Sequence, residues 1–261
     1  MFNFDEFQKN LNTKIIGKKI LYYEITDSTN RIAKELANKG AVDGTIIVAN
    51  QQTGGKGRLG RSFFSPGSKS ILMSIILRPK IFPNDAAKFT LMSAVAVSNT
   101  MIRFDLNPQI KWPNDILFDG RKVVGILTEM SADVDKINYI VVGIGINVNI
   151  ERDEFPEDLK NIAASLCEMK GEKISRADFL KIFIEEFEKL YVEANQNDFE
   201  KILNQWRKYN ITLGKKIRVL SAGSSEEFSA IAEDIDNEGA LIVKTENGLE
   251  KVFAGDVSIR E

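Results

Sequence analysis

Apolar runs and periodic apolar positions divide the N-terminal part of the chain into strands and one helix. Runs bounded by polar turns predict strands over residues 20–25, 45–50 and 71–77. Between the first two runs, apolar residues recur at every third or fourth position after the cap sequence at 27–30. This pattern predicts a helix that ends at Gly40.

The middle of the chain alternates between the two kinds of element. A stretch rich in Ala, Met and Val predicts a largely buried helix over residues 85–104. The same patterns predict strands over 109–112, 116–118, 122–130 and 139–147, and helices over 165–170, 176–195 and 198–209. Strands in succession, with helices before and after them, indicate an α+β fold built on a mixed sheet flanked by helices.

The pattern changes from Gly214 onward. Short strands separated by turn sequences are typical of a small β-barrel. The predicted strands cover residues 216–220, 229–234, 240–245 and 250–254. We therefore predict two domains, 1–212 and 213–261.

Composition narrows the class of protein. The 261 residues are 43% hydrophobic, which is ample for a core, and the net charge of −2 argues against a general nucleic-acid binder. No apolar run approaches the roughly 18 residues that cross a bilayer. The start of the chain also lacks the cations of a signal peptide. We expect a cytoplasmic protein with no DNA partner and no membrane partner.

The chain contains no histidine, and this absence limits its chemistry. It excludes Ser-His-Asp and Cys-His catalysis, histidine-ligated metals and imidazole proton relays. The groups that remain available for catalysis are Lys, Arg, carboxylates and backbone amides, together with Mg²⁺ if the protein binds it. They suit reactions governed by positioning and charge stabilisation, such as attack on a phosphoryl group.

The segment 54–61 contains four glycines and three cations after an apolar strand. Such a loop is suited to surround an anion, because glycine lets the backbone approach a ligand and Lys and Arg supply charged donors. It matches short dinucleotide and P-loop patterns, but both require a helix to follow. Here the strand at 71–77 follows, so we set both aside. A solvated basic turn remains the ordinary alternative.

Three other segments combine unusual residues, and each has an ordinary structural interpretation. Residues 27–30 carry hydroxyl and amide groups, which an N-cap would also explain. Residues 111–115 join a cation, an aromatic ring, a proline and a carboxylate, which a turn with a buried Trp would also explain. Residues 143–147 place two glycines in a strand, where they cost stability unless a ligand or another backbone comes close.

In this order and at this spacing, the segments resemble the catalytic domain of biotin protein ligases. The matching stretches are residues 27–30, 52–61, 111–115, 121–127 and 143–147. The resemblance implies a class II synthetase-like catalytic domain, shared with lipoate ligases, and a C-terminal SH3-like β-barrel. It also implies an enzyme that joins biotin and ATP into biotinyl-5'-AMP. The biotin then passes to a lysine of a biotin carboxyl carrier protein, as in acetyl-CoA carboxylase.

The resemblance also assigns roles to residues of this chain. Lys122 and Arg58 become the catalytic cations, and Asp115 a contact for Mg²⁺, although it could instead pair with Lys111. The biotin-binding residues are Ser28, Thr29, Asn30, Gln52, Gly55, Lys56, Gly57, Arg58, Lys122, Gly125, Leu127, Gly143 and Gly145. The ATP-binding and adenylate-binding residues are Arg58, Arg61, Phe63, Lys111, Asn114, Lys122 and Asn147.

Two positions depart from the usual family pattern. Lys56 stands where an arginine is usual, and Lys lacks the bidentate fork of a guanidinium group. Phe63 stands where many relatives have a Trp to pack on adenine, so the stacking area is smaller. Both changes affect the expected affinity and leave the expected reaction unchanged.

Three further expectations remain open from the sequence. Only 26 residues precede Asp27, too few for a winged-helix DNA-binding domain, so we expect a monofunctional ligase. An exposed sheet near the glycine loop would permit a homodimer or docking of the carrier protein by edge pairing. The alternative functions are a lipoate or octanoate ligase or transferase, and a non-catalytic biotin sensor.

Overall fold

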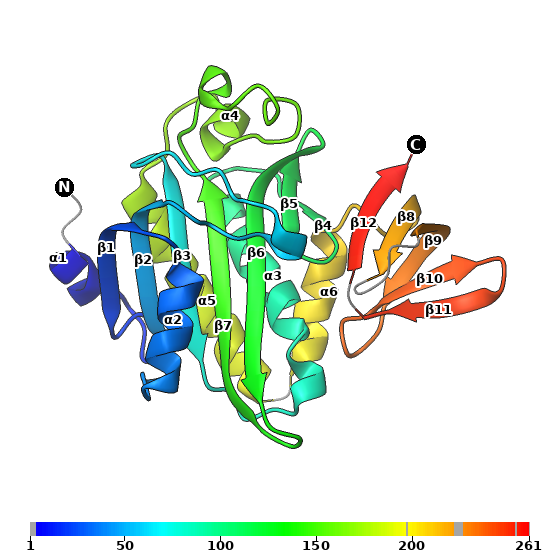
Figure 1. The fold of residues 1–261 in the computed structure, drawn as a ribbon, viewed down its shortest axis with the longest axis horizontal. Coiled ribbons are helices and arrows are strands. Elements are labelled where there is room, and N and C mark those ends of the chain that lie inside the picture. Colours follow the sequence, from blue (N-terminus) through cyan, green and yellow to red (C-terminus); the bar gives the residue numbers. More distant parts are fainter. Residues whose placement is uncertain (1–3, 197, 222–226, 254, 261) are drawn as a thin grey trace.

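A seven-stranded mixed sheet forms the centre of the larger part of the protein (Figure 1). The computed structural model describes residues 4–196, 198–221, 227–253 and 255–260. The strand order of the sheet is β1-β2-β3-β7-β6-β5-β4. The neighbours β1 and β2 are parallel, and all other neighbouring strands are antiparallel. The strands are β1 (Ile20–Thr26), β2 (Thr45–Gln52), β3 (Ser70–Leu77), β4 (Gln109–Lys111), β5 (Asp115–Phe118), β6 (Arg121–Ala132) and β7 (Ile137–Asn147).

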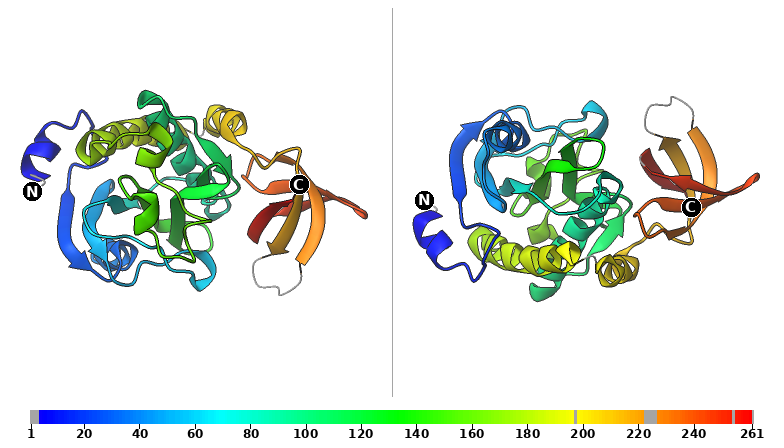
Figure 2. Two further views of the ribbon diagram at one scale, coloured as in Figure 1. Left: turned by 90° about the horizontal axis from the view of Figure 1, so that it is seen from above. Right: turned by 90° about the horizontal axis from the view of Figure 1, so that it is seen from below.

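Helices cover both faces of this sheet. On one face, α3 (Lys88–Arg103), α5 (Arg176–Asn195) and α6 (Phe199–Tyr209) enclose the main core, and α2 (Thr29–Asn38) packs on the other face (Figures 1 and 2). Every residue of β3 is buried, because the strand is central and has helices on both sides. Two short helices, α1 (Phe4–Lys9) and α4 (Leu166–Lys170), complete the α-helices of the described residues. The predicted α+β class is confirmed, although α1 was not predicted.

The register of the central strands places three glycines side by side. Gly143 of β7 lies opposite Leu127 of β6, and Gly145 lies opposite Gly125. Ser74 of β3 flanks Gly143 from the other side. Because Gly125, Gly143 and Gly145 carry no side chains, neighbouring side chains can lie directly over the backbone of the sheet here. We call this patch of β6 and β7 the low surface.

The C-terminal part is a five-stranded antiparallel sheet of order β11-β10-β9-β8-β12, set to one side of the larger part (Figure 2). Its strands are β8 (Lys216–Ser221), β9 (Glu227–Ile235), β10 (Leu241–Thr245), β11 (Gly248–Val252) and β12 (Gly255–Arg260). A β-sheet unit was predicted here as a small β-barrel, and the structure has an all-antiparallel sheet at this place. The strand predicted at 250–254 begins earlier, at Gly248, and residue 254 lies outside the described residues. The strand β12 was not predicted.

Polar contacts fix the C-terminal sheet against the larger part. The indole nitrogen of Trp112 donates to the carbonyl oxygen of Gly239 at 3.3 Å. The Nε atom of Arg207 lies 2.7 Å from a carboxylate oxygen of Asp234. Trp112 is fully buried, so the motif at 111–115 also anchors the two parts to each other.

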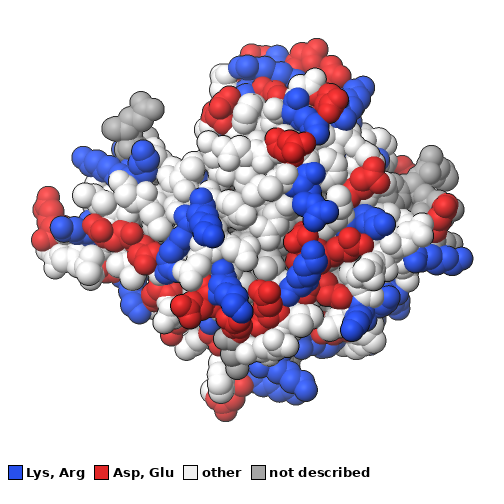
Figure 3. Space-filling view, turned by 180° about the vertical axis from the view of Figure 1, so that it is seen from behind, with Lys and Arg blue, Asp and Glu red and all other residues white. Residues whose placement is uncertain are grey.

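Acidic and basic side chains alternate on the face seen from behind, with uncharged surface between them (Figure 3). This mixture agrees with the small net charge of −2. Among the described residues, no helix is long and apolar enough to cross a membrane.

Candidate active site

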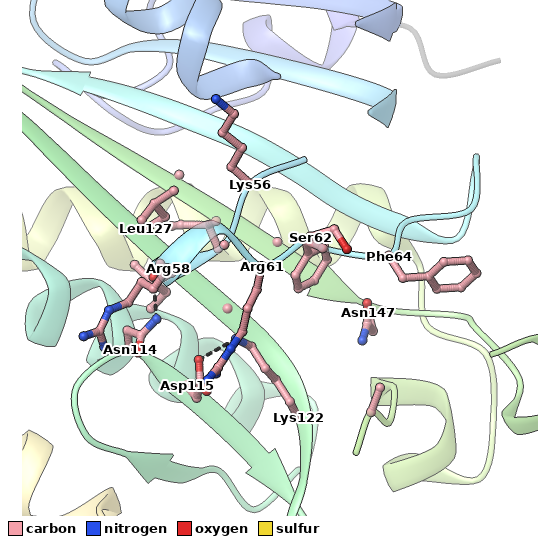
Figure 4. A pocket seen from close by; sticks show the side chains of 18 of the residues that line it. Lys56, Arg58, Arg61, Ser62, Phe64, Asn114, Asp115, Lys122, Leu127 and Asn147 are labelled. Carbon is pink, nitrogen blue, oxygen red and sulfur yellow. Dashed lines mark hydrogen bonds and ion pairs between the residues drawn. The ribbon is translucent and has the colours of Figure 1, made fainter. Parts of the chain in front are cut away.

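A cavity of about 430 Å³ opens between the start of α2, the glycine loop and the low surface of β6 and β7 (Figure 4). All the site residues predicted from the sequence line it except Gly55, which is buried beside Gln52 and Phe63. The predicted residues that line it are Ser28, Thr29, Asn30, Gln52, Lys56, Gly57, Arg58, Arg61, Phe63, Lys111, Asn114, Asp115, Lys122, Gly125, Leu127, Gly143, Gly145 and Asn147. Segments more than a hundred residues apart in the sequence therefore share one cavity.

One end of the cavity is lined by neutral hydrogen-bonding groups. Ser28 caps α2 by accepting from the backbone nitrogen of Arg31, as the N-cap interpretation predicted. The Oε1 atom of Gln52 accepts from the backbone nitrogen of Thr29 at 2.7 Å and from its hydroxyl at 3.0 Å. These bonds orient the Gln52 amide and leave its NH₂ group without a partner among the described residues. This end can both donate to and accept from a neutral polar ligand.

Asn30 is held in place beside this end. Its amide nitrogen donates to Glu129 at 2.8 Å and to the carbonyl of Leu127 at 3.3 Å, and its oxygen accepts from Ser74 at 2.6 Å. A Cβ atom on Gly143 would lie only 2.8 Å from the Cγ atom of Asn30. The group that comes close to Gly143 is therefore a side chain, where the sequence had suggested a ligand or another backbone.

The other two glycines of the low surface also lie beneath side chains. A Cβ on Gly145 would lie 2.7 Å from the ring of Phe63, and one on Gly125 would lie 2.8 Å from Cε of Lys122. Phe63 thus rests on the sheet itself. Lys122 reaches across β6 into the cavity because Gly125 has no side chain.

Cations gather at the opposite end of the cavity. Arg58 donates to Asn114 Oδ1 at 3.0 Å and to the carbonyl of Gly255 at 2.5 Å, and lies 3.7 Å from Asp256. Arg61 lies 2.8 Å from the same carboxylate. Strand β12 of the C-terminal sheet therefore contacts the glycine loop directly.

Lys122 and Asp115 form an ion pair of 2.6 Å at this end (Figure 4). The sequence had suggested Lys111 as the alternative partner of Asp115, and the structure corrects this. Four of the five cations that line the cavity, Arg58, Arg61, Lys111 and Lys122, lie at this end, and the described lining contains two carboxylates, Asp115 and Asp256. The net charge of this end is positive.

Burial makes two of these cations costly to keep charged. It lowers the pKa of Arg58 and of Lys111 from their ordinary values, against the opposing effect of Asp256 and Asp115. A bound anion would replace the water that these groups have lost. The electrostatics of this end therefore favour a multiply charged anion.

Lys56 does not join this cluster. Figure 4 shows its side chain directed away from Arg58, Arg61 and Lys122. Burial acts to raise the pKa of Glu129, hydrogen bonds from Lys34 and Asn30 lower it, and the charge of Lys56 adds a smaller lowering effect. The departure from the family's arginine thus falls at a position outside the cationic end.

Several cavity residues carried no recognisable signal in the sequence. Asp256 lies in a segment that no sequence pattern marked as a strand, far from every motif. Ser74, which does not line the cavity but holds Asn30 beside it, is one hydroxyl in an apolar run. A further wall consists of Phe155, Leu159, Ile162 and Ala163. This wall is fixed to β6 because Lys122 donates its backbone N–H to Ile162 and accepts from Ala164.

The carboxylates of the described cavity lining do not by themselves form a metal site. Among the described residues there is no group of three or more Asp, Glu or Cys side chains close enough to hold an ion. Asp115 and Asp256 nevertheless face the cationic end. Mg²⁺ commonly binds through one or two carboxylates together with substrate phosphates, so these residues fit an ion that arrives with phosphate.

Known proteins resemble both parts of this chain. Residues 22–147 match the biotin/lipoate A/B protein ligase family, and residues 212–260 match the biotin protein ligase C-terminal domain. The chain is 39% identical over 255 residues to the bifunctional ligase/repressor BirA of Bacillus spizizenii, covering 97% of this chain and 78% of that protein. It is 30% identical to the biotin acetyl-CoA-carboxylase ligase of Paracoccus denitrificans, covering 89% of this chain and 97% of that protein.

A solved structure extends the likeness to three dimensions. The biotin protein ligase from Aquifex aeolicus, in complex with biotin and ATP, is similar with a TM-score of 0.79 and 28% sequence identity. The similarity covers 93% of this chain and 99% of that chain. This chain belongs to the biotin protein ligase family.

Proposed function

We propose that the chain forms biotinyl-5'-AMP from biotin and ATP and transfers the biotin to a lysine of a biotin carboxyl carrier protein, as in acetyl-CoA carboxylase. The observation that carries this proposal is the division of the cavity into two unlike ends. A neutral hydrogen-bonding end lies at Ser28, Thr29 and Gln52, and a cationic end lies at Arg58 and Lys122. Biotin has a polar ureido ring at one end and a carboxylate at the other, so it suits this arrangement.

The neutral end would hold the ureido group. The Gln52 NH₂ group and the Ser28 hydroxyl can donate to its carbonyl oxygen, while the Thr29 hydroxyl, whose proton goes to Gln52, can accept from one of its N–H groups. The aliphatic tail would then run past Phe63, which itself covers Gly145. A lipoyl or octanoyl tail has no ureido group, so it would leave these partners unused.

At the cationic end, a carboxylate oxygen of biotin would attack the α-phosphorus of ATP. One P–O bond forms, the bond to the bridging oxygen breaks, and pyrophosphate leaves. The reaction brings two anions together, so cations that follow the developing charge lower its barrier without a proton relay. Lys122 can donate to the carboxylate and the α-phosphate, while Arg58 can fork onto phosphate.

Lys122 must leave Asp115 to take this role. The present ion pair of 2.6 Å shows that the ammonium group already reaches the cavity. Mg²⁺ bound with ATP would supply further charge neutralisation at the phosphates, and Asp115 and Asp256 are the residues that would hold it. Release of Lys122 would leave the Asp115 carboxylate free for that contact.

The buried side-chain oxygen of Asn147 suggests that the adenine base binds beside this residue. It is 4% exposed, its amide nitrogen donates to the carbonyl of Ala164 at 3.0 Å, and its Oδ1 atom has no partner among the described residues. A buried acceptor without a donor costs stability, and the amino group of adenine would supply that donor. Phe63 and Phe64 also line the cavity and offer rings for a base to pack on.

In the second step the amine of the carrier lysine would attack the carbonyl carbon of the mixed anhydride. An amide bond forms, the bond to AMP breaks, and the amine loses a proton to solvent. Enclosure by the glycine loop would protect the anhydride from water until then.

The test is biotin transfer to a purified apo carrier domain in the presence of ATP and Mg²⁺, read by intact mass, with lipoate as a parallel substrate. We expect a mass increase with biotin alone. The variant Lys122→Met should reduce adenylate formation by at least about 100-fold, because one donor to the developing charge is lost. The exposed control Lys39→Met should match wild type. Transfer of lipoate, or full activity of Lys122→Met, would overturn the proposal.

A further inference from the structure

A second cavity, of about 470 Å³, lies between strands β1, β2 and β3 and the first turns of α5. Its lining combines buried apolar residues, among them Val48, Ile71 and Leu180, with polar side chains. None of its lining residues lines the first cavity. It lies at the base of segment 53–69, the connection between β2 and β3 that carries Arg58.

Arg176 is the cation in this cavity, and it lacks a charged partner. It is half-buried at the first position of the 20-residue helix α5, and its NH1 atom donates to the carbonyl of Ser70 at 2.9 Å. Among the described side chains it makes no ion pair, and burial lowers its pKa. A cation at a helix N-terminus is also repelled by the helix dipole. A bound anion would relieve both costs.

The buried hydroxyl of Ser70 is a second, independent indication that this cavity binds a ligand. Its side chain is 1% exposed and lines this cavity, and its hydroxyl has no hydrogen-bond partner among the described residues. Buried hydroxyls are normally paired, because an unpaired one costs free energy. The hydroxyl and the Arg176 guanidinium belong to residues already in contact, so one small group can reach both.

The other polar groups of the cavity are already paired. The carboxylate of Glu24 accepts from the Tyr22 hydroxyl at 2.6 Å and from the Asn50 amide at 2.7 Å. Asn50 in turn accepts from the backbone and hydroxyl of Ser68, which ties the two ends of segment 53–69 together. The negative charge of Glu24 disfavours a doubly charged ligand such as phosphate.

We propose that this cavity binds a small monocarboxylate with a short aliphatic chain. The carboxylate accepts two hydrogen bonds from Arg176 and one from Ser70, and the chain packs on Val48, Ile71 and Leu180. This site is separate from the proposed biotin and ATP site. Its occupation would also stiffen the base of the loop that carries Arg58.

The test is a titration of the full chain with sodium pentanoate, followed by amide nitrogen–proton NMR in the presence of saturating biotin. Under the proposed function biotin occupies the first cavity, so a pentanoate signal there would be suppressed. We expect saturable shifts at the amides of Ser70, Arg176 and Leu180. The neutral analogue pentanamide should give none.

Variants decide whether the carboxylate is recognised. Arg176→Gln should weaken pentanoate binding at least about tenfold, since charge-assisted hydrogen bonds are lost. Arg152→Gln, an equal change of charge at an exposed position, should leave it unchanged. Ser70→Ala keeps the charge and should weaken pentanoate binding about threefold or more. This second variant tests the site even if Arg176→Gln disturbs the fold. Equal binding of pentanamide, or unchanged binding in both Arg176→Gln and Ser70→Ala, would overturn the proposal.

Discussion

Substitution of Gly143 by alanine should destabilise the protein through a single crowded contact. The new Cβ would lie 2.8 Å from Cγ and 2.9 Å from Nδ2 of Asn30, closer than side-chain atoms normally approach. The Asn30 side chain cannot move aside without a loss of stability, because it is buried and hydrogen-bonds to Ser74, Leu127 and Glu129. Either the strand shifts or Asn30 turns away and loses these bonds.

The expected loss of stability combines the cost of overpacking with the cost of the lost hydrogen bonds. Overpacking a core position costs about 1–3 kcal/mol, and each lost hydrogen bond costs about 1 kcal/mol. We expect a total near 3 kcal/mol, which corresponds to a fall in Tm of roughly 6–12 °C for a domain of this size. Because Asn30 lines the cavity next to Thr29, biotin affinity should fall as well.

Denaturant unfolding and scanning calorimetry of Gly143→Ala would measure the loss. Gly67→Ala is the matched control, since its Cβ would meet no described atom closer than 3.6 Å and its backbone is unstrained. The double variant Asn30→Ala with Gly143→Ala should be less destabilised than the sum of the single variants, because the clash disappears. A loss below about 1 kcal/mol in Gly143→Ala would refute the reasoning, as the contact would then be relieved without breaking bonds.

Three other predictions address the cavity and its surroundings. Asn147→Ala should raise the KM for ATP about tenfold with little change in biotin affinity, measured by pyrophosphate release and calorimetry; an equal loss for both ligands would contradict the adenine contact. Lys56→Ala should change kcat/KM for ATP by less than about threefold, whereas Arg58→Ala should lower it more than about tenfold; equal effects would contradict the separation seen in Figure 4. Burial acts to raise the pKa of Glu129, but hydrogen bonds from Lys34 and Asn30 outweigh it and the pKa is lowered. The stabilising contribution of Glu129 is therefore present at neutral pH and is lost as the pH falls below about 4.5, so the stability difference from Glu129→Gln should shrink there, and a difference independent of pH would contradict the ion pair.

The elements of this fold were largely predictable because they depend on short-range periodicity. The helix over 176–195 begins and ends as predicted, since Ser175 caps it and its apolar positions recur at helical spacing. The strand that holds Gly143 and Gly145, β7, was also predicted near its observed ends. Strand β12 was missed because it has few apolar residues, and its pairing with β8 creates it.

The sequence by itself determined the family resemblance, the α+β class and the residues that could bind anions, because glycines, cations and caps act through local backbone geometry. The tertiary structure decided which partners those residues have. It paired Lys122 with Asp115, laid Phe63 on Gly145, and brought Asp256 to Arg58 and Arg61 from the other end of the chain. These contacts depend on sheet register and on the docking of the C-terminal sheet, which no local pattern encodes.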